Sequence, residues 1–160
     1  MTLDNDTLNI LFNIVNIIPL PVWILMVIAP KWNITHIIVR SHITSIILSI
    51  IFILLNIVHF TNEADEFEIS GFFSLNVIAY VFSKKSIVLI GWVHYLAFDL
   101  LIASWIFLDN LNNKSSISHI LMIPCFILTY TFGPSGFLLY VTLKKLKTIK
   151  YELADKNKNE

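Results

Sequence analysis

The chain has 160 residues, of which 56% are hydrophobic and 14% are charged, and its mean hydropathy is +0.75. This composition is typical of an integral membrane protein and argues against an ordinary soluble domain. Equal numbers of acidic and basic residues, 11 of each, give no indication of a nucleic-acid partner. The single cysteine, Cys125, excludes an internal disulfide and a C-x-x-C redox pair.

Four long apolar runs predict an all-α, polytopic membrane protein built as a four-transmembrane-helix bundle. Each run is close to the ~20 residues that a helix needs to cross the hydrocarbon core of a bilayer. The predicted spans are residues 8–30, 43–60, 87–108 and 117–143. They form one domain, residues 1–143, which is followed by a charged tail, residues 144–160.

The positions of the basic residues predict how this bundle is oriented. With four crossings, Lys84, Lys85 and the lysines of residues 144–150 share one side with the N-terminus, and Lys31, Arg40 and Lys114 lie on the other side. The positive-inside rule then places both termini in the cytoplasm and the protein in the inner (cytoplasmic) membrane.

The first two predicted spans carry polar faces. Pro19 and Pro21 should kink the first span, because proline removes a backbone donor and clashes with the preceding turn. Residues at steps of three and four share one helix face. These faces comprise Asp6, Asn9, Asn13, Asn16, Leu20 and Trp23 in the first span, and His42, Ser45, Ser49, Phe52, Asn56 and His59 in the second. We expect them to face the third span, either to hold the bundle together or to line a site.

The connection between the second and third spans has two parts. Residues 61–70, TNEADEFEIS, are acidic and predict an exposed loop. Residues 71–86, GFFSLNVIAYVFSKKS, predict a short helix at the membrane interface, which serves either as an anchor or as a lid over a site.

The third predicted span contains a carboxylate, Asp99, near its middle. A carboxylate at this depth costs roughly 2.5–3.5 kcal/mol on insertion scales, so such a residue is a functional candidate by default. Since no lysine or arginine lies at the same depth, we expect Asp99 to be buried and protonated at neutral pH. A protonated carboxyl group in a dry pocket can act as a general acid.

His94 is the candidate for the complementary base. At about 100° and 1.5 Å per residue, His94 and Asp99 lie about 140° apart around the helix and about 7.5 Å apart along it. They therefore flank a wedge that can face the interior of the bundle. The predicted substrate-binding residues are Trp92, Tyr95, Asn16, Asn56, Trp105 and Tyr130.

Helix breakers interrupt the fourth predicted span, IPCFILTYTFGPSGFLLY. Pro124 and the run Gly133–Gly136, which contains Pro134, should each disturb the hydrogen bonds of the helix. A kink for packing and an unwound segment that lines a cavity are both compatible with this pattern.

Metal binding and proton conduction are alternative interpretations of the polar residues. His42, His59, His94, His119, Asp99 and Asp109 could ligate a metal, but H-x-x-E-H, E-x-x-H and H-x-x-x-H spacings are absent from the sequence. We therefore expect neither a metal nor another cofactor. Asp99 with nearby Asn and Ser groups could instead form a proton relay.

The stretch GWVHYLAFDLLIASWIFLD, followed by ISHILMIPCFILTYTFGPSGFLLY, resembles the neoxanthin synthase family, the abscisic-acid-deficient-four proteins. The W-x-H-x-x-x-x-D core corresponds to Trp92, His94 and Asp99, and the early segment, residues 16–30, is similar more loosely. Later residues that fit the family pattern are Asp109, His119, Pro134 and Gly136.

This resemblance implies a four-helix membrane protein associated with the conversion of the epoxycarotenoid violaxanthin to the allenic neoxanthin. In such a reaction an acid protonates the epoxide oxygen, a neighbouring proton is lost, and an allene forms without redox change. The expected function is thus an acid/base isomerase of a carotenoid or another apolar isoprenoid. The competing interpretation is a non-catalytic module that binds a lipid, a pigment or a partner helix, with the proton relay as a third.

Overall fold

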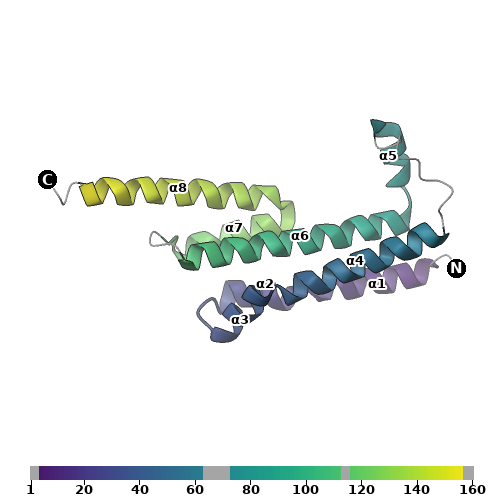
Figure 1. Cartoon of the computed structure of the whole chain (residues 1–160), viewed down its shortest axis with the longest axis horizontal. Helices are drawn as coiled ribbons and strands as arrows, with labels where there is room; N and C mark the ends of the chain where they lie inside the picture. Colours follow the sequence, from purple (N-terminus) through teal and green to yellow (C-terminus); the bar gives the residue numbers. More distant parts are fainter. Residues whose placement is uncertain (1–3, 63–72, 113–115, 157–160) are drawn as a thin grey trace. The chain divides into compact units, whose positions relative to one another are not determined.

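The computed structural model, described for residues 4–62, 73–112 and 116–156, consists of helices and contains no strand within those ranges (Figure 1). In chain order the helices are α1 (Asn5–Ile17), α2 (Leu20–Ile28), α3 (Asn33–Ser41), α4 (Ile43–Asn62), α5 (Leu75–Val81), α6 (Lys85–Asn112), α7 (His119–Phe132) and α8 (Pro134–Lys156). The predicted short helix between the second and third spans is present as α5. Most of the predicted acidic loop lies outside the described residues.

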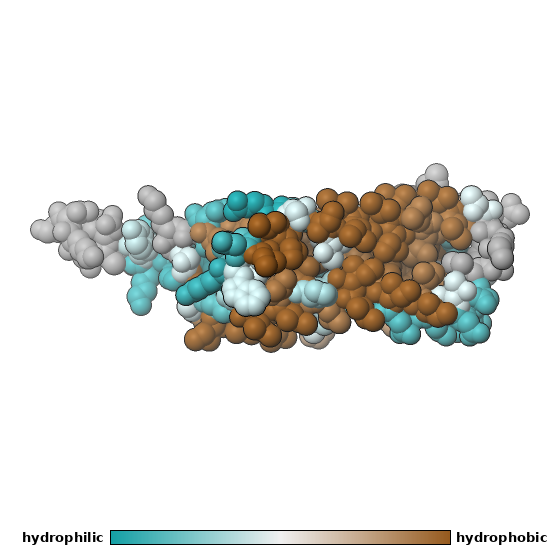
Figure 2. All heavy atoms as spheres, turned by 90° about the horizontal axis from the view of Figure 1, so that it is seen from below, coloured by the Kyte–Doolittle hydropathy of each residue, from teal (hydrophilic) through white to brown (hydrophobic). Residues whose placement is uncertain are grey.

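Three stretches are long and apolar enough to cross a membrane: Asn5–Ile28, Asn33–Thr61 and Lys85–Asn112. Figure 2 shows hydrophobic side chains over much of one face of the molecule, as a surface in contact with lipid requires. The predicted all-α membrane fold is therefore confirmed. The predicted count of four spans is not confirmed.

The first stretch is interrupted where the prolines predicted a kink. Helix α1 begins at an N-cap, Asp4, whose carboxylate accepts a hydrogen bond from the backbone N–H of Thr7 at 2.9 Å. It ends at Ile17, and α2 begins three residues later at Leu20. Pro19 lies in this break, at the position where the sequence predicted a kink.

The second stretch is longer than the sequence predicted, because residues 33–41 are also helical. Two hydrogen bonds fasten the start of α3 to the preceding turn: Thr35 Oγ1 donates to the Ala29 carbonyl at 2.7 Å, and His36 Nε2 lies 2.7 Å from the Pro30 carbonyl oxygen. Helix α3 ends at His42, which has a left-handed backbone with a φ of 51°, and α4 starts at the next residue. The predicted start of the span at residue 43 is thus the start of α4 alone.

The helices belong to two compact units. The first unit comprises Met1–Leu20 and Thr44–Ala97, and the second comprises Pro21–Ile43 and Phe98–Glu160. In the first unit, the early part of α6 packs with α1 and α4 through an aliphatic core. Its fully or nearly buried members are Leu8, Val15, Leu48, Leu55, Leu89, Ile90, Val93, Leu96 and Ala97.

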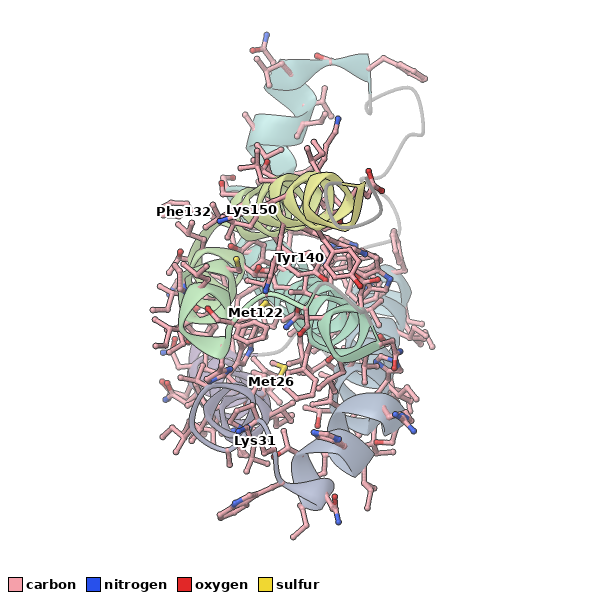
Figure 3. The ribbon with its side chains drawn as sticks, turned by 90° about the vertical axis from the view of Figure 1, so that its left-hand side faces the viewer. Met26, Lys31, Met122, Phe132, Tyr140 and Lys150 are labelled. Atoms are coloured by element: carbon pink, nitrogen blue, oxygen red, sulfur yellow. The ribbon has the colours of Figure 1, made fainter. Side chains whose placement is uncertain are left out.

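The second unit has a core of its own, formed by the later part of α6 with α2, α3, α7 and α8. Figure 3 shows Met26, Met122 and Tyr140 pointing into the space between these helices. Their side chains are almost completely buried, at 0%, 2% and 0% exposure. Close packing of this kind fixes α7 and α8 against the end of α6.

Helices α7 and α8 fold back on each other as an antiparallel hairpin. Ile117, just before α7, bonds to Asn110 near the end of α6, whereas Gly133 at the far end of α7 lies at Asp99. Helix α8 then returns, because Tyr140 bonds to Asp109. The segment 117–143, predicted as one span, is therefore two helices that run in opposite directions.

The prediction of a single fourth span is therefore wrong. The glycine–proline run neither kinks one helix nor unwinds a segment of it but reverses the direction of the chain. The expectation that both termini lie in the cytoplasm relied on a fourth crossing of the membrane. Because the chain turns back at Gly133, the expected cytoplasmic location of both termini loses its basis.

Glycine is required at two positions of the hairpin. Gly133 has a φ of +30°, a conformation that residues with a side chain rarely adopt. Pro134 follows as the first residue of α8, where its missing N–H costs the helix nothing. At Gly136, a Cβ atom would collide with the Thr129 side chain and with the backbone at Cys125, so this glycine allows α7 and α8 to approach closely.

Candidate functional site

Asp99 is buried in the second unit, with 6% of its surface exposed. Its Oδ1 atom would lie 2.5 Å from a Cβ atom at Gly133, so the carboxyl group lies directly against the turn between α7 and α8. The side chain therefore occupies the space that a larger residue at position 133 would need. The predicted burial of Asp99 agrees with the structure, and Gly133 is a neighbour that the sequence did not predict.

The N-terminal end of α8 is part of the surroundings of Asp99. Gly133 immediately precedes Pro134, so the Asp99 carboxyl group lies beside the N-terminal end of a helix of 23 residues. The helix dipole and the N–H groups of a first turn favour negative charge nearby.

Two aromatic pairs join the hairpin to neighbouring helices in the second unit. Trp105 contacts Phe137, with ring centroids 5.7 Å apart, and Tyr130 packs edge-to-face on Trp23 at 5.3 Å. Trp105, Tyr130 and Phe137 are also partly exposed. Two of the predicted substrate-binding residues, Trp105 and Tyr130, thus belong to the same unit as Asp99 and present aromatic surface outward.

The other predicted residues gather in the first unit. Trp92 Nε1 donates a hydrogen bond to Asn16 Oδ1 at 2.9 Å, and the Trp92 ring stacks on Tyr95 at 5.8 Å. Phe12 contacts the same indole ring at 5.8 Å. We call Phe12, Asn16, Trp92 and Tyr95 the aromatic cluster of the first unit.

His94 and Asn56 also lie in the first unit. His94 is exposed, and its ring lies 5.4 Å from that of Phe52. The Asn56 side chain donates to the Phe52 carbonyl of its own helix at 2.8 Å. The predicted acid and base therefore differ in burial and in their neighbours, since Asp99 is buried against Gly133.

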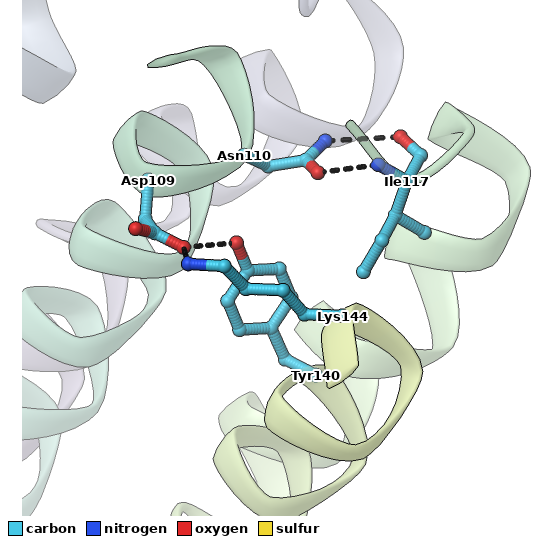
Figure 4. Close-up of polar contacts among 5 residues, drawn as sticks. All are labelled: Asp109, Asn110, Ile117, Tyr140 and Lys144. Carbon is cyan, nitrogen blue, oxygen red and sulfur yellow. Dashed lines mark hydrogen bonds and ion pairs between the residues drawn. The ribbon is translucent and has the colours of Figure 1, made fainter. Parts of the chain in front are cut away.

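A polar cluster at the end of α6 was not predicted as part of a site. Asp109 accepts a hydrogen bond from the Tyr140 hydroxyl and forms an ion pair with Lys144 at 2.5 Å (Figure 4). Asn110 makes two hydrogen bonds with the backbone of Ile117, at 2.7 and 3.0 Å. The spacing of Tyr140 and Lys144 was the available signal, because residues four apart share a helix face.

These features define a class: a helical membrane protein in which a buried carboxyl group at the middle of one helix lies against the turn of a helical hairpin. The ABA DEFICIENT 4-like family model matches residues 10–140, which includes both elements. The chain therefore belongs to the ABA DEFICIENT 4-like family.

The relative found among curated proteins is "Protein ABA DEFICIENT 4, chloroplastic" from Arabidopsis thaliana. It is 29% identical over 136 residues, which cover 83% of this chain. The chain matches 60% of the length of that relative. No solved structure matches the chain.

Proposed function

We propose that this protein is a membrane isomerase that acts on a carotenoid or another long apolar isoprenoid, with Asp99 as the acid. The observation that carries the proposal is the burial of Asp99 against Gly133 in the middle of α6. A carboxyl group held away from water is suited to proton donation. Family membership supports a function related to that of the ABA DEFICIENT 4 proteins.

The proposed reaction is balanced without a cofactor. Asp99 gives its proton to an epoxide oxygen of the substrate as a carbon–oxygen bond breaks, which leaves a hydroxyl group. A neighbouring carbon then loses a proton, and its electron pair forms the new double bond. The Asp99 carboxylate can take up this proton, so that substrate and product are isomers and the acid is regenerated. The role of His94 as a separate base remains a sequence prediction.

The exposed aromatic rings of the second unit suit a long apolar substrate. Trp105, Tyr130 and Phe137 offer flat faces on which a conjugated chain could stack. Such a substrate would reach the protein from within a bilayer, and a cell membrane is the environment that the apolar helices require. The cytoplasmic membrane is the location that we propose.

The experiment is to express the chain in a carotenoid-producing host and to compare the extracted pigments by mass spectrometry and chromatography. Asp99→Asn keeps the size of the side chain but cannot supply a comparable proton. We expect a new isomeric product with the wild type and a loss of at least about 100-fold in its formation with Asp99→Asn, as general acids typically contribute. The matched control is Asp109→Asn, which changes a carboxylate of the same helix that is paired with Lys144.

Equal product formation by the folded Asp99→Asn variant would contradict the acid role. A second candidate function, a non-catalytic pigment- or lipid-binding module, is favoured by the aromatic cluster of the first unit. It predicts a co-purifying molecule that is chemically unchanged and that is lost on Trp92→Ala but retained in Asp99→Asn.

A further inference from the structure

The turn of the α7–α8 hairpin lies at the middle of the membrane-spanning helix α6. Asp99 lies 14 residues after the start of α6 at Lys85 and 13 residues before its end at Asn112, so it marks the middle of this span. Helix α7 has 14 residues and is about 21 Å long, which is less than the ~30 Å of a hydrocarbon core. Its far end meets Asp99 at Gly133. The hairpin therefore turns near the middle of the membrane.

The part of α8 that leads back from the turn to the membrane surface spans half of the hydrocarbon core. From Pro134 to Lys144, α8 rises over ten residues, or about 15 Å, which is half of the hydrocarbon core. The distance from Asp99 to Asp109 along α6 is also ten residues. The ion pair between Lys144 and Asp109 joins the two helices at this level. Lys144 is thus placed where α8 leaves the hydrocarbon and enters the headgroup layer.

The lysines of this part of α8 divide into two pairs. Lys144 and Lys147 are engaged by the protein, since Lys144 pairs with Asp109 and Lys147 donates to the Ser116 carbonyl. Lys145 and Lys150 are exposed and form no ion pair with the described residues. Figure 3 shows the position of Lys150 on α8. Leu146 and Ile149, also exposed, lie between these two free lysines in the sequence.

The second unit also shows at which end of α6 the helix α8 emerges. Lys147 of α8 lies at Ser116, beyond the end of α6. His119 Nε2 lies 2.7 Å from the carbonyl oxygen of Val27, so the end of α2 lies near the start of α7. The part of α8 that follows Lys144 therefore lies at the face where α6 ends.

We propose that α7 and α8 form a re-entrant hairpin that enters and leaves the bilayer at a single face. We further assign Lys145 and Lys150, the two exposed lysines of residues 144–150, as the groups that bind the anionic headgroups of that leaflet. The face where α6 ends carries Lys31 and these lysines, whereas the opposite face carries Lys84 and Lys85. The positive-inside rule makes the former the cytoplasmic face.

Cysteine labelling tests the path of the chain. Cys125 is the single cysteine and is buried, so Cys125→Ala gives a background for single reporters at exposed positions. Asn112→Cys and Glu152→Cys would be treated with a membrane-impermeant maleimide in right-side-out and inverted vesicles. We expect both positions to react from the same, cytoplasmic side, because a hairpin that turns back at Gly133 returns to the face where α6 ends. Labelling of positions 112 and 152 from opposite sides would overturn the hairpin.

A second measurement tests the contact with headgroups. The reaction of Ile149→Cys with a neutral, water-soluble maleimide would be compared in vesicles of phosphatidylcholine and in vesicles that also contain phosphatidylglycerol. We expect a slower reaction with the anionic lipid, by about fivefold for each free lysine. Lys145→Gln with Lys150→Gln should abolish the difference, and Lys84→Gln with Lys85→Gln should preserve it. A rate that is independent of the lipid would overturn the headgroup surface.

Discussion

The two units hold the same long helix by different means. In the first unit, α6 packs against α1 and α4 through an aliphatic core, and the Asn16–Trp92 hydrogen bond lies at a partly exposed position. In the second unit, it packs against a hairpin through a buried carboxyl group, a glycine turn and an ion pair. Lipid tails can replace the contacts of aliphatic side chains, but they cannot form hydrogen bonds with polar groups. The hairpin should therefore depend far more on single residues than the first unit does.

The largest effect is expected from Gly133→Ala. The alanine must adopt a positive φ, and its Cβ atom would collide with the Asp99 carboxyl group. Strain and overpacking together should lower the free energy of unfolding by about 2–4 kcal/mol. Unfolding in a denaturing detergent, followed by tryptophan fluorescence, measures this change.

Gly91→Ala provides the matched comparison in the first unit. A Cβ atom at position 91 would come within 3.3 Å of the ring of Phe82, a side chain that can move aside. We expect a change several times smaller than at position 133. Equal losses for the two variants would remove the proposed difference between the units.

Tyr140→Phe should have the next largest effect. The variant keeps the buried ring but removes the hydroxyl group that donates to Asp109. A hydrogen bond to a charged acceptor is typically worth about 1.5–3 kcal/mol, and we expect a loss near the lower end because Lys144 remains. The same detergent titration applies, with the exposed Tyr151→Phe as control. An unchanged stability would show that the cluster does not fasten the hairpin.

A smaller effect is expected for Asn16→Leu in the first unit. This substitution removes the acceptor for Nε1 of Trp92, a residue that is 38% exposed. The expected loss is about 0.5–1 kcal/mol, as for other hydrogen bonds between membrane helices. Asn13→Leu, at an exposed position of the same helix, is the control. A loss of stability as large as that of Tyr140→Phe would contradict the claim that the hairpin depends more on single residues than the first unit does.

The smallest effect concerns the N-cap of α1. The hydrogen bonds that Asp4 accepts from Thr7 hold the pKa of Asp4 below its ordinary value of 3.8. Because the folded pKa is the lower one, the carboxylate stabilises α1 above pH 3.8, and this contribution is lost as the pH falls through the folded pKa. Thermal unfolding of the wild type and Asp4→Ala should therefore differ near neutral pH and converge in acid. A difference that grows in acid would contradict this.

The sequence predicted the apolar helices, the break at Pro19 and the burial of Asp99 because each depends on local composition. Length and hydropathy identify a helix in lipid, and proline acts on its own turn. The sequence could not predict the direction of the chain after Gly133. A glycine–proline pair is compatible with a kink, an unwound turn or a reversal, and only the contacts of Ile117, Gly133 and Tyr140 with α6 decide between them.

For the same reason, the sequence predicted the candidate site only in part. Positions on one helix can be related by geometry, so the divergence of His94 and Asp99 around α6 could be expected. Contacts between distant segments could not be deduced from periodicity, and both Gly133 at Asp99 and Lys144 at Asp109 were missed. The Asn16–Trp92 hydrogen bond joined two predicted residues without either pattern indicating the pair.

The central claim is that Asp99, buried against the turn of the hairpin, is the acid of the proposed reaction. Infrared spectroscopy of the purified protein in lipid tests it directly, because a protonated carboxyl group has a carbonyl stretching band that a carboxylate lacks. The account predicts this band at neutral pH in the wild type and in Asp109→Asn, and its disappearance in Asp99→Asn. A wild-type spectrum without the band, or a band that persists in Asp99→Asn, would contradict the role of Asp99 as a neutral acid.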